Sequence, residues 1–357
     1  MDRPIDFLRT RDVVGAAGRP AATAKDHNNR GALLHVDGHL AAARAEYEAA
    51  LALDPANATA LNNLGFLVAQ EGRLDEAIAY YQQALESDPT RSMAYANLGV
   101  ALTVRGDTEA GLEALTRAVE LDGRNVLAWD NLGRLCLAAG DAEAAETSWR
   151  NALEVTPTDA RLLTSLGTAV AAQQRLGEAI DIYQQALALD ATLATAWAQL
   201  GAVLFMRQDL GYATEALRRA LSLAPEDTAA RYHLAMVLVA RGERGEAAVE
   251  LERILRFEPA HLSARRDLAV LALARGDLGD ALTRLEAILA EHPDDERARF
   301  YHAIVLGQMG RTEEAAAEMA ALAALPVGEY PDRARAYLAT QPAAQGAGNM
   351  AAEAPSR

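Results

Sequence analysis

Small residues recur every 34 residues along most of this chain. Glycine holds the position six times and alanine then holds it three times without a break in the count: Gly31, Gly65, Gly99, Gly133, Gly167, Gly201, Ala235, Ala269 and Ala303. A fixed period of this length indicates supersecondary units that stack on one another, because no single unit can bury its own apolar face. The chain is therefore predicted to be a repeat array, and binding is the function that such an array favours.

Each period contains two segments with helical spacing of apolar residues, such as 60–70 and 74–85. The first segment is followed by a residue that accepts left-handed dihedrals at a helix C-terminus, glycine in seven repeats and glutamine in two: Gly38, Gly72, Gly106, Gly140, Gln174, Gln208, Gly242, Gly276 and Gly310. A proline follows the second segment in six repeats. No segment alternates with period two, so we predict an all-α protein.

Positions within a repeat are numbered here from its first residue, with the first repeat starting at residue 24. Position eight is the small residue above, position twenty is also small, and position twenty-four is bulky, as in Ala43 with Tyr47 and Ala145 with Trp149. This pattern resembles the tetratricopeptide repeat (TPR) family. The resemblance implies a right-handed superhelical α-solenoid of nine helix-turn-helix repeats with a C-terminal capping helix.

The predicted organisation has five parts. They are a flexible N-terminal segment (1–23), repeats one to six (24–227), repeats seven to nine (228–327), a capping helix (328–340) and a disordered tail (341–357). Repeats seven to nine are separated because position eight changes from glycine to alanine while position twenty-seven changes from alanine to Ile254, Ile288 and Leu322. Larger side chains on both helices are expected to move them apart, so the curvature is predicted to change near Thr228.

Charge and composition exclude several classes of partner. The formal net charge is −16, with 34 Lys and Arg against 50 Asp and Glu, which disfavours nucleic acid. The single cysteine, Cys136, lies on an apolar stripe and is interpreted as a core thiol. The first residues carry charges where a signal peptide requires an apolar stretch, and no run approaches 18 apolar residues. We therefore expect a cytoplasmic protein without membrane insertion.

Position six carries the strongest functional signal. It is Asn29, Asn63, Asn97 and Asn131 in the first four repeats. This series resembles the asparagine ladder in the TPR region of O-linked N-acetylglucosamine transferases, which implies that these side chains hold a peptide backbone on the concave face. An amide offers both a donor and an acceptor and so can bind backbone without reading sequence. The alternative is that each asparagine bonds a neighbouring helix backbone or water.

The other residues that family geometry places on the concave face are mostly apolar, and methionine beside aromatic rings suits a surface that accommodates varied side chains. Together with the four asparagines, the predicted peptide-contacting residues are Phe66, Val100, Arg134, Phe205, Met206, Tyr232, Met236 and Phe300. Arg134 is the one charge central to the ladder region.

A series of arginines at position four, Arg231, Arg265 and Arg299, extends to Arg333 at the same spacing. Two interpretations remain open. The aliphatic stems cover the seam between repeats while the guanidinium groups pair with local carboxylates, or the series docks an acidic or phosphorylated partner segment.

The chain shows no phosphate loop, nucleophile motif or metal cluster, so we predict no enzyme activity, no cofactor and no metal site. The favoured function is a non-catalytic adaptor that binds an extended peptide or a disordered partner segment in its concave groove. Alternatives are a self-assembling structural scaffold or the targeting or regulatory subunit of a separately encoded enzyme. The sequence leaves the partner, the pathway and the oligomeric state open, and also whether the N-terminal segment docks on the groove.

Overall fold

The computed structural model describes residues 22–340. The tail predicted at 341–357 lies outside the described residues, as does the predicted N-terminal segment apart from its last two residues. Within the described part of the chain there are nineteen helices and no strand, which confirms the all-α prediction.

Nine helical hairpins follow one another in the predicted register. The first helices are α1 (Ala24–Val36), α3 (Ala58–Gln70), α5 (Ser92–Arg105), α7 (Val126–Ala138), α9 (Ala160–Ala172), α11 (Ala194–Met206), α13 (Thr228–Ala240), α15 (Leu262–Ala274) and α17 (Glu296–Gln308). The second helices are α2 (Leu40–Leu53), α4 (Leu74–Ser87), α6 (Thr108–Leu121), α8 (Ala142–Val155), α10 (Leu176–Leu189), α12 (Leu210–Leu223), α14 (Arg244–Phe257), α16 (Leu278–Glu291) and α18 (Thr312–Ala323). A final helix, α19 (Glu329–Thr340), packs on α17 and α18 and buries Pro331 and Ala334.

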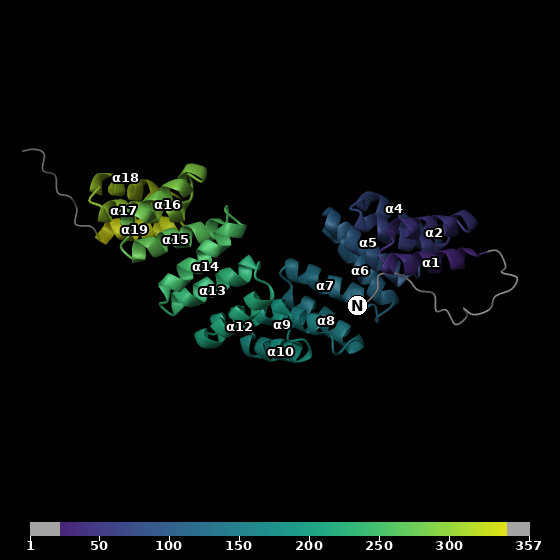
Figure 1. Ribbon diagram of the computed structural model, residues 1–357. Helices are drawn as coiled ribbons and strands as arrows, with labels where there is room; N and C mark the ends of the chain where they lie inside the picture. The colour runs from purple at the N-terminus through teal and green to yellow at the C-terminus, as the bar shows by residue number, and fades with distance from the viewer. Residues whose placement is uncertain (1–21, 341–357) are drawn as a thin grey trace, which may run out of the picture. The chain divides into compact units, whose positions relative to one another are not determined.

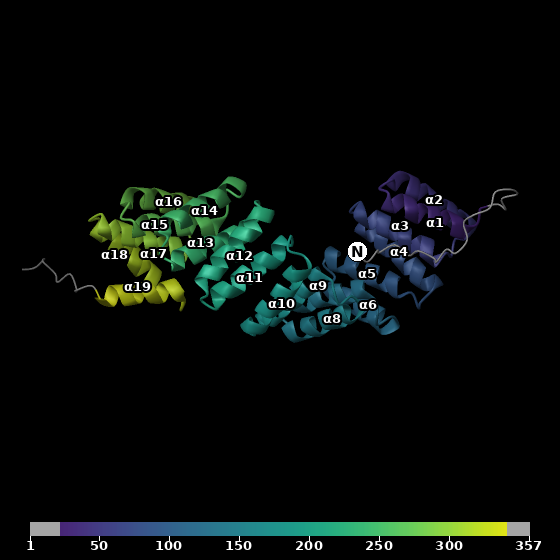
Figure 2. The same cartoon turned by 60° about the horizontal axis from the view of Figure 1, so that its bottom comes forward.

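The chain divides into two compact units after Gln208. Unit 1 contains α1 to α11 and unit 2 contains α12 to α19, each a row of successive helices (Figures 1 and 2). The division falls between the two helices of the sixth repeat. The change of curvature near Thr228 stays a prediction.

The hairpins of unit 1 are closed by a glycine facing a large side chain, as positions eight and twenty-four predict. A Cβ atom placed on Gly133 would lie 2.6 Å from the indole of Trp149, and one on Gly167 would lie 2.6 Å from the ring of Tyr183. Gly31 and Gly65 approach Tyr47 and Tyr81 in the same way, and Gly99 approaches Leu115. Only glycine leaves room for these side chains, so the small residue and the bulky residue form one packing unit.

The turn residues behave as the sequence predicts. All seven predicted turn glycines have positive φ, and the two substitutes, Gln174 and Gln208, have φ of 63° and 67°. Glutamine in the left-handed region carries a steric cost that glycine does not. The hairpin geometry therefore overrides the local preference of these two residues.

Repeats seven to nine are packed differently. Ala235, Ala269 and Ala303 are buried together with Ile254, Ile288 and Leu322 from the second helices. The two helices of each hairpin approach one another less closely here than in repeats one to five. Here the small residue at position eight is alanine rather than glycine, and position twenty-seven is isoleucine or leucine rather than alanine.

In unit 1, first helices of successive repeats also contact one another, as α1 with α3, α3 with α5, α5 with α7 and α9 with α11. We call the surface that these first helices present the first-helix face of unit 1.

Candidate functional site

The asparagines of the second and third repeats join successive first helices. Asn63 donates from Nδ2 to Oδ1 of Asn28 at 3.0 Å, and Asn97 donates in the same way to Asn62 at 2.9 Å. Each bond runs from position six to position five of the preceding repeat, 35 residues earlier. Asn63 is 0% exposed and Asn97 is 5% exposed, so both amides are built into the seams between repeats. Their contact with a peptide stays a prediction.

The other two predicted asparagines lie in different surroundings. Asn131 follows a repeat with alanine at position five, and its Nδ2 donates instead to the carbonyl of Leu127 in its own helix at 2.8 Å. Asn29 is half-buried, and its Oδ1 is a buried acceptor with no hydrogen-bond partner in the described structure. Asn131 also lines a cavity.

That cavity, the inner pocket, lies on the first-helix face of unit 1 between α5 and α7. Its volume is about 270 Å³ and its lining residues are Val100, Thr103, Val104, Asn131, Arg134, Leu135 and Ala138. Residues four apart on a helix share one face, which is why Val100 and Val104 lie together on α5 and Arg134 and Ala138 on α7. The structure thus brings together three predicted site residues, Val100, Asn131 and Arg134.

Contacts between side chains of α7 and α8 hold Arg134 at the edge of the inner pocket. Arg134 pairs with Oδ2 of Asp130 at 3.1 Å, and Oδ1 of Asp130 accepts from the indole N–H of Trp149 at 2.9 Å. The side chain of Arg134 is 63% exposed. An exposed pair of this kind contributes little to stability, so the guanidinium group is available to a ligand at small cost.

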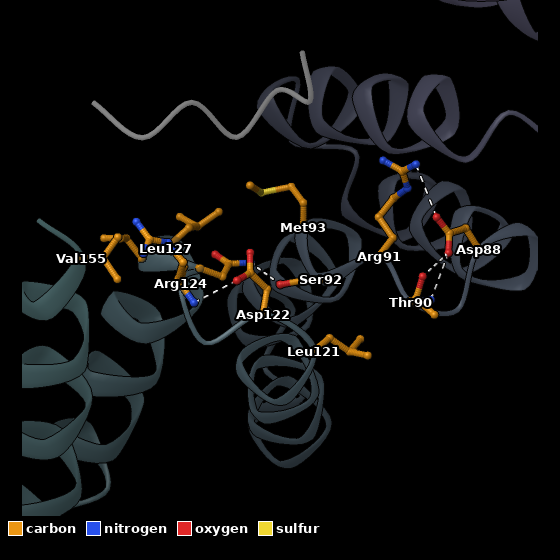
Figure 3. Close-up of a pocket in the computed structure, with 12 residues that line it drawn as sticks. Asp88, Thr90, Arg91, Ser92, Met93, Leu121, Asp122, Arg124, Leu127 and Val155 are labelled. Carbon is orange, nitrogen blue, oxygen red and sulfur yellow. Dashed lines mark hydrogen bonds and ion pairs between the residues drawn. The ribbon is translucent and has the colours of Figure 1, made fainter. Parts of the chain in front are cut away.

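A second and larger cavity, the outer pocket, lies where the loops enter the same two helices (Figure 3). Its volume is about 510 Å³. Its walls combine charged and polar residues with apolar ones: Asp88, Thr90, Arg91, Ser92, Asp122, Arg124, Asn125, Met93, Leu121, Val126, Leu127 and Val155. The sequence analysis did not predict this cavity, because its residues come from three consecutive repeats.

Hydrogen bonds make one wall of the outer pocket rigid. Asn125 caps α7 by accepting from the backbone N–H of Ala128 at 3.0 Å, and its Nδ2 donates to Oγ of Ser92 at 2.7 Å. Ser92 in turn donates to the carbonyl of Ala118 at 2.8 Å. The starts of α5 and α7 and the end of α6 are therefore tied together beneath the cavity.

The remaining predicted residues of unit 1 lie elsewhere on first helices. The ring of Phe66 packs against the ring of His35, with centroids 5.4 Å apart, and Nε2 of His35 lies 2.8 Å from Oε1 of Gln70. Phe205 is half-buried and Met206 is 48% exposed on α11. Neither described pocket includes these residues.

In unit 2, the predicted residues lie within packing networks. Tyr232 donates from its hydroxyl to Oδ2 of Asp267 at 2.7 Å, and Arg297 pairs with Oδ1 of the same carboxylate at 2.5 Å. Burial, reinforced by Asp267, raises the pKa of Tyr232 to about 12. Phe300 packs 5.8 Å from the ring of Tyr330 and so helps to hold α19, while Met236 is half-buried on α13.

Position four has a structural use that the sequence analysis missed. Its side chain donates to the carbonyl six residues earlier, from Trp129 to Gly123 at 2.8 Å and from Trp197 to Ala191 at 3.0 Å. Arg231 does the same to Pro225.

The arginine series of repeats seven to nine is mostly paired within the fold. Arg231 is buried and bonds Glu250 at 2.7 Å, Arg265 bonds Glu291 at 2.7 Å, and Arg333 bonds Glu329 at 3.0 Å. Arg333 also lies 5.2 Å from the ring centre of Tyr330. These contacts favour the interpretation in which the series stabilises the repeats.

Two further expectations concern metal sites and membranes. No cluster of three or more potential metal-ligating side chains occurs within residues 22–340, and no helix in that range is long and apolar enough to span a bilayer. Cys136 is half-buried, and burial raises the pKa of its thiol, which lowers its reactivity. The cytoplasmic location stays a prediction.

Sequence comparison identifies the family. Residues 6–230 match the family described as the Cilia and flagella-associated protein 70 C-terminal domain, a TPR family whose match spans more than half of the chain. The chain belongs to this family. Residues 184–299 match the TPR domain of cytochrome c-type biogenesis protein H, and residues 272–331 match a general tetratricopeptide repeat family. The TPR prediction is confirmed, whereas the likeness to the transferase ladder is not. No curated protein sequence matches the chain.

Solved structures with the same fold include the Cut9–Hcn1 hetero-tetramer of the APC/C, with 20% identity and a TM-score of 0.57 over 70% of this chain and 53% of that one. This chain therefore spans about half the length of that relative. PilW, a type IV pilus biogenesis factor, is 22% identical with a TM-score of 0.54 over 58% of this chain and 96% of that one. PilF of Pseudomonas aeruginosa is 20% identical with a TM-score of 0.52, over 58% and 95%. These similarities concern the fold.

Proposed function

We propose that this protein is a non-catalytic adaptor that holds an extended segment of a protein partner on the first-helix face of unit 1. The inner pocket carries the proposal. It is an open hollow on the first-helix face, and Val100, Val104, Leu135 and Ala138 give it apolar walls. Its volume of about 270 Å³ is just below the range typical of small-molecule sites, which suits a single side chain of a partner.

The polar groups around the inner pocket support backbone binding. Asn131 is half-buried on its wall and retains its amide oxygen as an acceptor, while Arg134 at the edge supplies exposed donors. Val104 is 66% exposed, so apolar surface is available without rearrangement of the fold. Binding one apolar side chain there would remove this surface from water.

The ends of the array weigh against open-ended stacking of whole molecules. At the first repeat, position seven is Arg30, which pairs with Glu46 at 3.0 Å, whereas repeats two to eight have leucine there. At the other end, α19 covers α17 and α18. A polar outer face and an added helix are the features expected of capping elements. A targeting subunit for a separate enzyme would use the same groove and is one form of the adaptor proposed here.

A site-specific photo-crosslinker tests the proposal in the full-length protein. Benzoylphenylalanine placed at Val104 should yield a crosslinked partner protein from the native extract, because this side chain projects at the inner pocket. The matched control is the same residue at Leu112 on α6, which is 41% exposed on the second helix of the same repeat. Equal crosslinking at both sites, or crosslinking at Leu112 alone, would place the partner elsewhere.

A further inference from the structure

The first helix of the array has an exposed stripe that later first helices bury. Positions three, seven and ten lie on one face of a helix, because residues three and four apart are neighbours on its surface. In repeats two to eight these positions are all apolar and buried. In α1 they are Asp26, Arg30 and Leu33, which are all exposed, Leu33 to 58%. Within residues 22–340, this stripe of α1 is therefore uncovered.

In later repeats the stripe is covered by the second helix of the preceding repeat. On α7 the stripe is Ala128, Leu132 and Leu135, which form one apolar cluster with Leu115 and Ala118 of α6. The two α6 residues occupy positions twenty-four and twenty-seven of their repeat, and these positions are buried in all nine repeats. A helix that covers α1 therefore needs apolar side chains at positions twenty-four and twenty-seven.

The sequence that precedes α1 meets this requirement. Counting back one period of 34 residues from α2 (Leu40–Leu53) gives residues 6–19, which lie outside the described residues. Positions twenty-four and twenty-seven then fall on Val13 and Ala16. The match to the Cilia and flagella-associated protein 70 C-terminal domain family begins at residue 6, the position equivalent to the start of α2. The register of the array thus extends into the sequence before α1.

Position twenty departs from the repeat pattern in this segment, where it is Arg9. In the nine repeats a small residue at this position allows close approach within the hairpin. A Cβ atom on Gly99 would lie 2.9 Å from the carbonyl oxygen of Gly111, which is at position twenty of that repeat. A helix that packs on α1 alone does not meet this constraint. Residues 6–19 thus keep the side chains that cover the next repeat and lack the one that closes a hairpin.

We propose that residues 6–19 form a helix that packs on the exposed stripe of α1 as α2 packs on α3, with Val13 and Ala16 against Arg30 and Leu33. The connection from 20 to 23 has the same four-residue length as the connection from 54 to 57 between α2 and α3. The segment can therefore reach the stripe without any change in the first hairpin.

The polar residue in the stripe is compatible with this packing. Arg30 extends its guanidinium group to Glu46 at 3.0 Å, and its aliphatic stem can contact Val13 while the charge stays in water. The occupant of this face is a segment of the same chain, so the inner pocket stays open to a partner. This inference does not depend on the proposed function.

Cysteine crosslinking in the full-length protein tests the register. In a Cys136→Ser background, Val13→Cys with Arg30→Cys should form an intramolecular disulfide, because positions twenty-four and seven belong to one cluster in later repeats. The matched control is Val14→Cys with Arg30→Cys, since position twenty-five is exposed in all nine repeats. The first pair should oxidise about tenfold faster, because packing raises the effective concentration of one thiol at the other.

Three results of the crosslinking would overturn the proposal. Equal rates for the two pairs would mean that the segment is not held in this register. Faster reaction of Val13→Cys with Val104→Cys than with Arg30→Cys would place the segment at the inner pocket. A disulfide between two molecules would make a second copy of the chain the occupant of the stripe.

Hydrogen exchange gives an independent measurement without cysteines. In the unsubstituted full-length protein, the backbone amides of residues 10–19 should exchange about tenfold more slowly than in Val13→Asp, the change expected when burial of one aliphatic side chain is lost. Val14→Asp introduces the same charge one residue later and should leave their exchange unchanged. Exchange of these amides at the rate of an unstructured peptide in the unsubstituted protein, or equal effects of the two substitutions, would also overturn the proposal.

Discussion

In repeats one to three, amide side chains join successive first helices, whereas in repeats seven to nine a tyrosine, an aspartate and an arginine do so. The tyrosine and the aspartate occupy positions five and six, as the amides do. Asn63 reaches back to Asn28, and Asp267 accepts from Tyr232 across the same interval of 35 residues. The amide link is neutral, while the second link holds a buried carboxylate that needs Arg297 as its counter-charge. The same pair of positions thus holds either a neutral amide link or a charged link, and breaking the two links should cost different amounts of stability.

The packing of the two helices within each hairpin also differs between these two regions. Glycine with an aromatic ring or leucine brings the helices of repeats one to five close together, and alanine with isoleucine or leucine keeps those of repeats seven to nine further apart. Burial of a polar group without its partner is costly, and so is a methyl group where none fits. Repeats one to five should therefore be destabilised most by a methyl group added at position eight. Repeats seven to nine should be destabilised most by loss of a partner of the buried carboxylate.

The largest effect is expected at Asp267. Asp267→Ala leaves Arg297 and the Tyr232 hydroxyl without their shared acceptor, and breaking such a pair costs about 3 kcal/mol, the lower end of the range because Arg297 is partly exposed. Hydrogen exchange of the full-length protein should show the loss in α13 to α17. The control is Asp294→Ala, which removes the same charge at an exposed position. A similar loss of protection in this variant would show that the contacts of Asp267 are not responsible.

Gly133→Ala should be the next most disruptive. Its new Cβ meets Trp149 at 2.6 Å, and overpacking of this kind costs about 2 kcal/mol. Gly177→Ala in the first turn of α10 is the matched control, because nothing lies within 4 Å of its Cβ and alanine is the better helix former. The two changes should therefore have opposite signs in urea denaturation. If both substitutions stabilised the protein, the glycine at position eight would not be required for close packing of the hairpin.

Alkaline pH should weaken unit 1 more than repeats seven to nine. Burial raises the pKa of Tyr183 to about 12, and also raises the pKa of Tyr47 and Tyr81, whereas the same position holds leucine or methionine in repeats seven to nine. The unfolded chain loses these protons first, so the stabilisation is complete below pH 10 and declines as the pH approaches 12. At pH 11 the loss from Tyr183 is about 1.4 kcal/mol.

Tyr183→Phe should remove that share of the pH dependence, and ultraviolet titration of the tyrosinates should show ionisation well above pH 10. In unit 2, burial raises the pKa of Tyr232 and of Tyr330 on α19. Equal loss of protection in both units at pH 11 would contradict the prediction.

The smallest effect separates the two kinds of asparagine. Asn97→Ala removes the donor to Asn62 and leaves a buried acceptor unpaired, at a cost of about 1 kcal/mol. Asn131→Ala removes only a bond within its own helix and should change stability by less than about 0.5 kcal/mol. Urea denaturation of both variants measures the difference. Equal destabilisation would show that Asn131 also supports a seam between repeats.

The repeat boundaries, the turns and the glycine packing follow from the sequence because each depends on contacts within one hairpin. The hydrogen-bond partner of Asn63 could not be predicted, because it depends on how one repeat packs against the next. The paired asparagines at 28–29 and 62–63 were the available signal, since their spacing places position five opposite position six. Of the predicted site residues, Val100, Asn131 and Arg134 line the inner pocket, while the outer pocket could not be predicted because it requires three repeats to be placed together.

The bond between positions five and six also determines which neighbours a repeat tolerates. An asparagine amide is both donor and acceptor, so loss of repeat two would place Asn97 against Asn28, and loss of repeat three would place Asn131 against Asn62, with an amide pair restored in either case. The link from Tyr232 to Asp267 has a direction, because the phenol donates and the carboxylate accepts. The amide link of the N-terminal repeats therefore survives loss of repeat two or of repeat three, whereas loss of repeat eight would remove Asp267 and leave the Tyr232 hydroxyl without its acceptor.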